Sequence, residues 1–150
     1  MIAYCGLYCG DCVMHKGTVA DLARDLRKEL RGARFDRMAK VLADTPYFKE
    51  LKNYGTCYEV LGTFVKFRCG KVCQDGGGPP NCTIRKCCQN RGYAGCWECD
   101  DLETCEKFDF LRAVHGEACQ KNLRRIRRKG PEAFVQGKRD WYVPERSRDE

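Results

Sequence analysis

The chain has 150 residues, a net charge of +7 and 13 cysteines. A hydrophobic fraction of 43% argues against wholesale disorder, and no apolar run reaches the ~18 residues that a membrane helix needs. The first residues show neither the basic nor the apolar region of a secretory signal, so the sequence predicts a cytoplasmic protein with no membrane partner.

The first half of the chain has the periodicity of amphipathic helices. Apolar residues recur at helical spacing in two sets, which lie on different helix faces and are separated by Gly32. We therefore expect helices over about 18–31 and 34–44, with a break or sharp kink at Gly32. A threonine followed by proline opens a short helix over 45–52, and a capping box at 56–59 precedes a fourth helical pattern.

The second half combines a loop, knuckles and further helices. The helical pattern stops at Cys69, and the glycines and prolines within 70–81 indicate a loop. The cysteine-dense segment 82–105 is expected to form one short helix and tight knuckles. A long helix is predicted over about 107–129 and a last short helix over 131–136, separated by a Gly-Pro pair.

No stretch shows convincing strand-length alternation, so the predicted fold class is mostly α. We expect a small helical domain with cysteine-rich metal-binding knuckles. The chain length is typical of one domain. The sequence predicts this as a single zinc-stapled helical domain over 1–143, followed by a charged, frayed tail over 144–150.

The spacing of the cysteines favours metal sites over disulfides. An odd number of thiols cannot pair completely within one chain, and disulfides persist mainly in oxidising compartments. Two residues between thiols let one tight turn point both sulfurs at a single ion, which is the repeated unit of structural zinc sites. Zinc is therefore the expected cofactor, with an iron–sulfur cluster as the alternative, since four-cysteine sets also suit clusters.

Four motifs follow one another along the chain: CGLYCGDC at 5–12, CTIRKC at 82–87, CWEC at 96–99 and CEKF at 105–108. In this order they resemble the CGLxCxxC, CxIRxC, CxxC and CEKL segments of a bacterial and archaeal family of cysteine-rich domains of unknown function. The resemblance implies metal binding, with zinc as the metal, and no established reaction. This chain departs from the family at Cys69-x3-Cys73, where a CxGC pair is usual, and at Cys88, where a small residue is common.

Because four thiolates close one site, the most economical arrangement has two sites. The first predicted ligand set is Cys5, Cys9, Cys12 and Cys73. The second predicted ligand set is Cys82, Cys87, Cys96 and Cys99. Cys69 and Cys105 are substitutes or ligands of a further ion. The three other thiols are expected to pack as small buried hydrophobes, and they are Cys57, Cys88 and Cys119.

These features favour a binding or interaction module with structural metals over an enzyme. The CxxxCxxC spacing at 5–12 also occurs in radical enzymes that use S-adenosylmethionine, but Asp11 stands before the last cysteine and no alternation of strands and helices follows. The two histidines, His15 and His115, are expected to be surface or hydrogen-bonded residues. The alternative is a metal- or thiol-dependent enzyme, or an iron–sulfur protein, with a site near Cys5, Cys9 and Cys12.

The basic run at 121–129 makes nucleic acid the candidate partner. It contains six Lys and Arg residues and no acidic residue. The same run is typical of a solvated helix face near a C-terminus, where the helix dipole favours cations. A nucleic-acid partner would be recognised by an affinity that falls steeply as salt rises.

Overall fold

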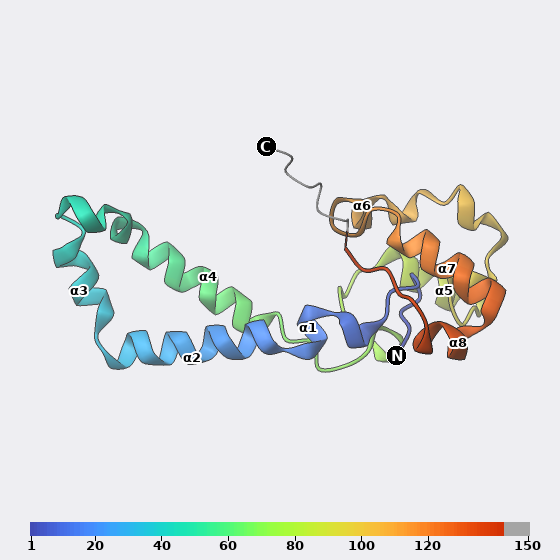
Figure 1. Cartoon of the computed structure of the whole chain (residues 1–150), viewed down its shortest axis with the longest axis horizontal. Helices are drawn as coiled ribbons and strands as arrows, with labels where there is room; N and C mark the ends of the chain where they lie inside the picture. Colours follow the sequence, from blue (N-terminus) through green and yellow to red (C-terminus); the bar gives the residue numbers. More distant parts are fainter. Residues whose placement is uncertain (143–150) are drawn as a thin grey trace. The chain divides into compact units, whose positions relative to one another are not determined.

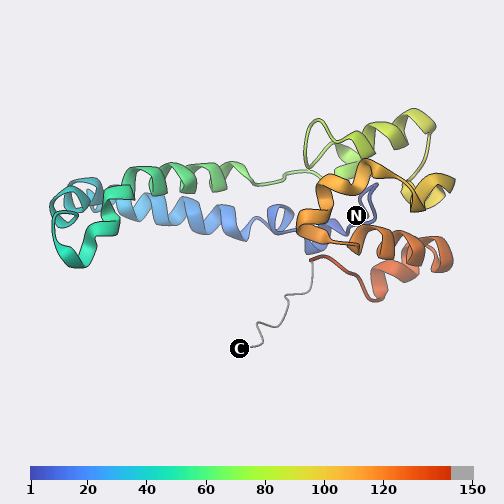
Figure 2. The ribbon, with the colours of Figure 1, turned by 90° about the horizontal axis from the view of Figure 1, so that it is seen from above.

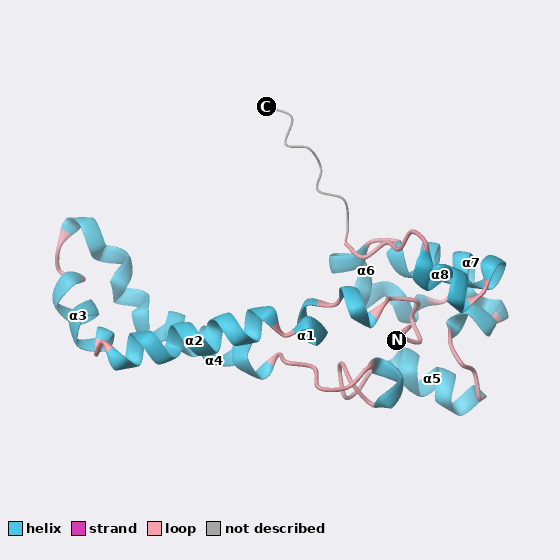
Figure 3. Cartoon of the chain, turned by 60° about the horizontal axis from the view of Figure 1, so that its bottom comes forward, coloured by secondary structure: helices cyan, strands magenta, loops and turns pink. Residues whose placement is uncertain are grey.

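The fold is mostly α, as predicted. The computed structural model describes residues 1–142, and this part of the chain holds eight α-helices joined by 3-10 turns and loops, with no strand (Figure 3). A single isolated bridge joins Ile2 to Tyr8. No helix of these residues combines the length and the apolar character that a bilayer crossing requires. The frayed tail predicted over 144–150 lies outside the described residues.

The chain gathers into two compact units, which can be followed by colour in Figure 1. One unit is Val13–Cys69, and the other combines Met1–Cys12 with the chain from Gly70 onward. The single domain predicted over 1–143 stays a prediction, because two compact units can unfold together or separately.

The unit Val13–Cys69 is a helical hairpin. Its helices are α1 (Val13–Lys16), α2 (Thr18–Gly32), α3 (Phe35–Leu42) and α4 (Tyr54–Lys66), with a 3-10 helix at Pro46–Asn53. Figure 2 shows α2 and α4 side by side. The Arg27 guanidinium lies 4.4 Å from the centroid of the Tyr58 ring and joins the two helices.

The break between α2 and α3 lies directly after Gly32. The N–H of Ala33 still donates to the carbonyl of Glu29, so Gly32 belongs to the helix. The chain turns at Arg34, whose φ of 52° is the only positive value at a non-glycine residue within 1–142. The predicted pair of helices is present, and the first one ends at Gly32, with the turn between them at residues 33–34.

Small side chains mediate the packing of the hairpin. Its buried apolar side chains are Ala20, Ala23, Ala39 and Ala43. Leu22, one of the apolar residues that recur at helical spacing in this segment, is 66% exposed. The periodicity located the helix correctly, but alanine lets two helices approach closely and leaves the larger side chains outside.

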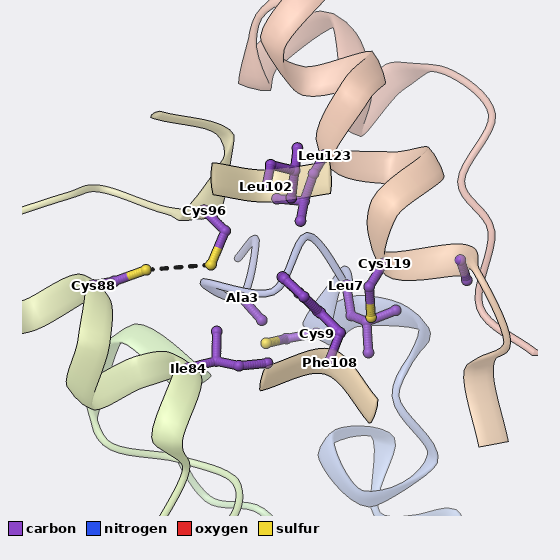
Figure 4. Close-up of a cluster of buried hydrophobic side chains, with 11 residues drawn as sticks. Ala3, Leu7, Cys9, Ile84, Cys88, Cys96, Leu102, Phe108, Cys119 and Leu123 are labelled. Atoms are coloured by element: carbon purple, nitrogen blue, oxygen red, sulfur yellow. Dashed lines mark hydrogen bonds between the residues drawn. The ribbon is translucent and has the colours of Figure 1, made fainter. Parts of the chain in front are cut away.

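The second unit holds the large buried side chains of the described chain. Its helices are α5 (Thr83–Arg91), α6 (Asp109–His115), α7 (Ala118–Lys129) and α8 (Pro131–Gln136). Its 3-10 turns are Cys9–Asp11, Cys73–Asp75, Cys96–Glu98, Asp100–Glu103 and Glu106–Phe108. Phe108, Leu102 and Ile84 form the centre of the core, which Figure 4 shows in close-up. The short helix predicted within 82–105 and the helix predicted over 131–136 are present, and tight 3-10 turns follow the first of them.

The long helix predicted over 107–129 is broken. Helix α6 ends at His115, and Gly116 adopts φ 53° and ψ −124°, a conformation open to glycine and strained for other residues. Helix α7 begins at Ala118. As expected, His115 is hydrogen-bonded, through Nδ1 and the carbonyl of Trp141.

A buried asparagine ties the end of the described chain to α7. Asn122 is 0% exposed, and its Nδ2 donates to the carbonyl of Asp140 at 2.7 Å. The Asp140 N–H donates back to Asn122 Oδ1 at 3.0 Å. Both ends of the buried amide are satisfied, which is the condition for burying it.

Candidate metal centre

The first motif folds into a tight turn that presents three thiols. The Ala3 N–H donates to the carbonyl of Leu7 at 2.7 Å, and Gly6 turns the chain with φ 83°. The 3-10 turn that follows lets the Cys12 N–H donate to the carbonyl of Cys9 at 3.1 Å. This C-x-x-C turn is the knuckle geometry expected from the spacing.

Two cysteines from later in the chain join this turn. A backbone hydrogen bond from Cys73 reaches the Cys9 thiol, whose pKa is nevertheless raised by burial. The pKa of Cys73 is raised to about 11, first by burial and then by the neighbouring thiols of Cys5, Cys82 and Cys9. Cys82 thus acts electrostatically on Cys73, although the two thiols were predicted in different ligand sets. These thiols are the first thiol group: Cys5, Cys9, Cys12, Cys73 and Cys82.

Five thiols surround a cavity in the core of the same unit. They are the second thiol group: Cys87, Cys88, Cys96, Cys99 and Cys105. The cavity has a volume of about 20 Å³, enough for one water-sized species. Three members of this group, Cys87, Cys96 and Cys99, belong to the second predicted ligand set. The group also contains Cys105, which was predicted only as a substitute or as a ligand of a further ion. A wider hollow of about 420 Å³ lies against Cys87, Cys99 and Cys105.

The second C-x-x-C knuckle is held by backbone and arginine contacts. The Cys99 N–H donates to the carbonyl of Cys96 at 3.1 Å, and the Cys96 N–H donates to the carbonyl of Tyr4 at 2.9 Å. Arg91 Nη1 lies 3.6 Å from Cys99 Sγ and 3.2 Å from Asp101 Oδ2. Arg91, the last residue of α5, thus bridges the knuckle and the turn that follows it.

Of the three cysteines that were expected to pack as buried hydrophobes, two are buried and one is exposed. Cys88 and Cys119 are buried, as expected, but each touches a predicted ligand. The sulfurs of Cys88 and Cys96 are 3.4 Å apart (Figure 4). A hydrogen bond with Cys119 is the first cause that raises the pKa of Cys5 well above its usual value, and burial is the second. Cys57 is exposed, so the prediction that it is a buried hydrophobe was wrong.

The described thiols do not form a closed coordination sphere. Within residues 1–142, no three Cys, His, Asp or Glu side chains converge closely enough to ligate one ion. Cys69 belongs to the other compact unit, where its N–H donates to the carbonyl of Met14 at 3.0 Å. The ligand sets therefore stay predictions, and side-chain rotations within each thiol group are needed to close a site.

The basic run of α7 makes contacts within the fold that no local pattern indicated. Arg124 Nε donates to Glu103 Oε1 at 2.8 Å, and Arg127 Nε donates to the carbonyl of Trp97 at 2.9 Å. Arg125 donates to Asn122 and pairs with Asp140. Lys121 Nζ lies 3.7 Å from Glu117 Oε2, so four of the six cations that suggested nucleic acid have intramolecular partners. The nucleic-acid interface over 121–129 stays a prediction.

The comparisons with known proteins identify a family of unknown function. A family model described as "Protein of unknown function (DUF3795)" matches residues 1–110. No curated protein and no solved structure matches the chain. The matched residues are well over half of the chain and hold 12 of its 13 cysteines. The chain therefore belongs to the DUF3795 family of proteins of unknown function.

Proposed function

We propose that this chain is a zinc-binding protein, with structural four-thiolate sites that hold a binding or interaction module together. The observation that carries the proposal is the second thiol group, in which five thiols from α5, the 96–99 knuckle and Cys105 line one small cavity. Thiolates are the ligands that zinc prefers in structural sites. The cavity lies beside the apolar core, so an ion there would fasten the segments that form that core.

The first thiol group supports a second site. Besides burial, Cys5, Cys82 and Cys9 each raise the pKa of Cys73, and Cys12 and Cys5 raise that of Cys9. We propose that four of these five thiols bind one ion and that Cys82 belongs here. Cys105 then takes its place in the second site. This regrouping moves Cys82 to the first site, brings in Cys105 as a ligand of the second site, and leaves one thiol of the first group without a metal.

Structural sites fit this chain better than a catalytic one. Each thiol group offers enough thiols to close a tetrahedral site, and a catalytic zinc needs an open position. Zinc–thiolate sites also persist in a reducing cytosol, where we place the protein. Each bound zinc stabilises its fold by on the order of 10 kcal/mol, which is comparable to the whole stability of a domain.

Metal analysis of protein purified under reducing conditions tests the proposal. We expect about two zinc ions per chain, and we expect a strong chelator to unfold the second unit as followed by circular dichroism. A brown protein that absorbs near 400 nm would instead identify an iron–sulfur cluster. Less than one metal ion per chain with the fold intact would contradict the proposal.

Single variants test the regrouping. Cys82→Ser is expected to weaken the first site, and Cys105→Ser the second, each with loss of about one zinc per chain. Cys57→Ser is the matched control, because Cys57 is exposed and belongs to neither group. Full zinc content in both Cys82→Ser and Cys105→Ser would show that the sites use other ligands.

A further inference from the structure

The second thiol group contains one thiol more than a single ion uses. Its five thiols line one cavity, and a tetrahedral zinc site takes four. Cys88 is the surplus member, because it is 2% exposed, does not line the wider hollow and, unlike Cys96, belongs to no C-x-x-C pair. A thiol that is next to a site but outside it is available for chemistry of its own.

Cys88 is in contact with a candidate ligand. Its sulfur is 3.4 Å from that of Cys96, and both side chains are buried (Figure 4). A disulfide has an S–S length of about 2.05 Å, so the two sulfurs need to approach by little more than one ångström. The intervening loop contains Gly92, which has φ 70° and open space around its Cα. This loop can absorb so small a movement.

We propose that Cys88 and Cys96 are a site of reversible disulfide formation by small peroxides. The step is a two-electron oxidation. A thiolate sulfur of the pair attacks one peroxide oxygen, the O–O bond breaks, and a sulfenic acid and hydroxide form. The second sulfur then attacks the sulfenic sulfur, the S–O bond breaks, and a second hydroxide leaves. Counting the two thiol protons, the products are one disulfide and two water molecules.

The shape of the cavity makes the site selective for the oxidant. Its volume of about 20 Å³ admits a species of the size of water, and hydrogen peroxide is only slightly larger. Aromatic disulfides and alkylating reagents do not fit. We therefore expect Cys88 to resist these reagents in the folded protein while it reacts with peroxide.

Formation of this disulfide would couple oxidation to metal release, a consequence that rests on the proposed zinc site. Cys96 is a predicted zinc ligand, and a disulfide sulfur is not a thiolate donor. Closing the pair therefore removes one of four ligands from the second site. Reduction of the disulfide by a thiol returns Cys96 to the site, so the change is reversible.

Peptide mapping of the wild-type protein tests the disulfide without reference to metal. The protein is treated with hydrogen peroxide, blocked with an alkylating reagent and digested with trypsin, which cleaves after Lys86 and Arg91. We expect tandem mass spectrometry to find Cys88 joined to Cys96. A map in which peroxide joins other cysteines, or oxidises Cys88 and Cys96 without joining them, would overturn the proposal.

Zinc release tests the coupling. The wild type is expected to release about one zinc per chain on treatment with peroxide, and Cys88→Ala to release it on the order of tenfold more slowly, since the second thiol no longer reacts intramolecularly. Cys57→Ser, which removes an exposed thiol of the other unit, should release zinc as the wild type does.

The outcomes separate this inference from the proposed function. If purified Cys88→Ala carries less zinc than the wild type, Cys88 is a ligand and the proposal is wrong. Equal release rates in the wild type and Cys88→Ala would also refute it. If no form of the protein binds metal, the proposed function fails, while the peptide map still decides whether the pair forms.

Discussion

Arg127 donates a hydrogen bond from Nε to the main-chain carbonyl of Trp97, at 2.9 Å and across 30 residues of sequence. Its Nη2 donates to the carbonyl of Cys99 as well. One arginine of α7 thus holds two carbonyls of the C-x-x-C knuckle. Arg127 belongs to the basic run that suggested a nucleic-acid partner, and it fixes the backbone that carries the candidate ligands Cys96 and Cys99.

Loss of this arginine should loosen the knuckle. We expect Arg127→Ala to lower the free energy of unfolding by about 1–2 kcal/mol, because two hydrogen bonds from a charged donor are lost. We also expect it to speed zinc loss to a competing chelator. Chemical denaturation and chelator competition measure the two effects. Arg128→Ala is the control on the same helix, and a similar loss in both variants would contradict the specific role of Arg127.

Gly6 is required by both backbone and packing. Its φ is 83°, and a Cβ there would lie 2.7 Å from Cγ of Leu123, which is fully buried. We expect Gly6→Ala to cost about 2–3 kcal/mol of folding free energy from strain and overpacking. The matched control is Gly32→Ala, which has open space around it in α2 and should stabilise by about 0.5 kcal/mol. Equal stabilities of the two variants in denaturation would disprove this account.

The arginine of the CTIRKC motif, Arg85, binds the loop that precedes the motif. It is 7% exposed, and its guanidinium donates to the carbonyls of Gly77, Pro79 and Pro80. We expect Arg85→Lys to cost about 1–3 kcal/mol, because an ammonium cannot reproduce the fork of donors and leaves some of these carbonyls, including that of buried Gly77, without their partner. Hydrogen exchange should show faster exchange in the loop 70–81.

The adjacent residue supplies the control for Arg85. Lys86 is exposed, and its contact with Asn81 is long, at 3.5 Å. Lys86→Ala should change the stability by less than about 0.5 kcal/mol. An unchanged loop in Arg85→Lys, with exchange rates equal to those of the wild type, would show that the loop is held by other contacts.

The ion pair between α7 and the 100–103 turn should depend on pH. Hydrogen bonding to Arg124 holds the pKa of Glu103 below its usual value. Because the folded-state pKa is lower, the pair stabilises the fold above the unfolded-chain pKa of about 4.3, and this contribution is lost as pH falls through the folded-state pKa. Glu103→Gln should therefore lower the Tm slightly at pH 7 and low salt, since exposed pairs are weak.

The comparison across pH is the decisive measurement for Glu103. The difference in Tm between the wild type and Glu103→Gln should shrink towards zero below about pH 4. Glu50→Gln, which changes an exposed carboxyl of the helical hairpin, should show no such trend. A difference that is the same at pH 7 and below pH 4 would show that charge does not cause it.

Local patterns predicted the local structure well. Three features depend on residues that are close in sequence: the helix over 131–136, helix α2 from Thr18, and the turns around the C-x-x-C pairs. Periodicity, proline and glycine positions and thiol spacing carry that information directly. The sequence did not predict the break at Gly116, because the residues on both sides of it keep a helical pattern. Only the tertiary path of the chain requires the turn.

By itself, the sequence determined that this protein is helical, that it is rich in closely spaced cysteines, and that it resembles a family of unknown function. Only the tertiary structure decided that Cys82 lies with Cys73, that Cys105 lines the cavity with Cys96, and that Cys88 touches Cys96. The reason is physical. Spacing reports which thiols one turn can bring together, whereas the meeting of distant segments depends on how loops and helices pack, and that packing leaves no periodic signal in the chain.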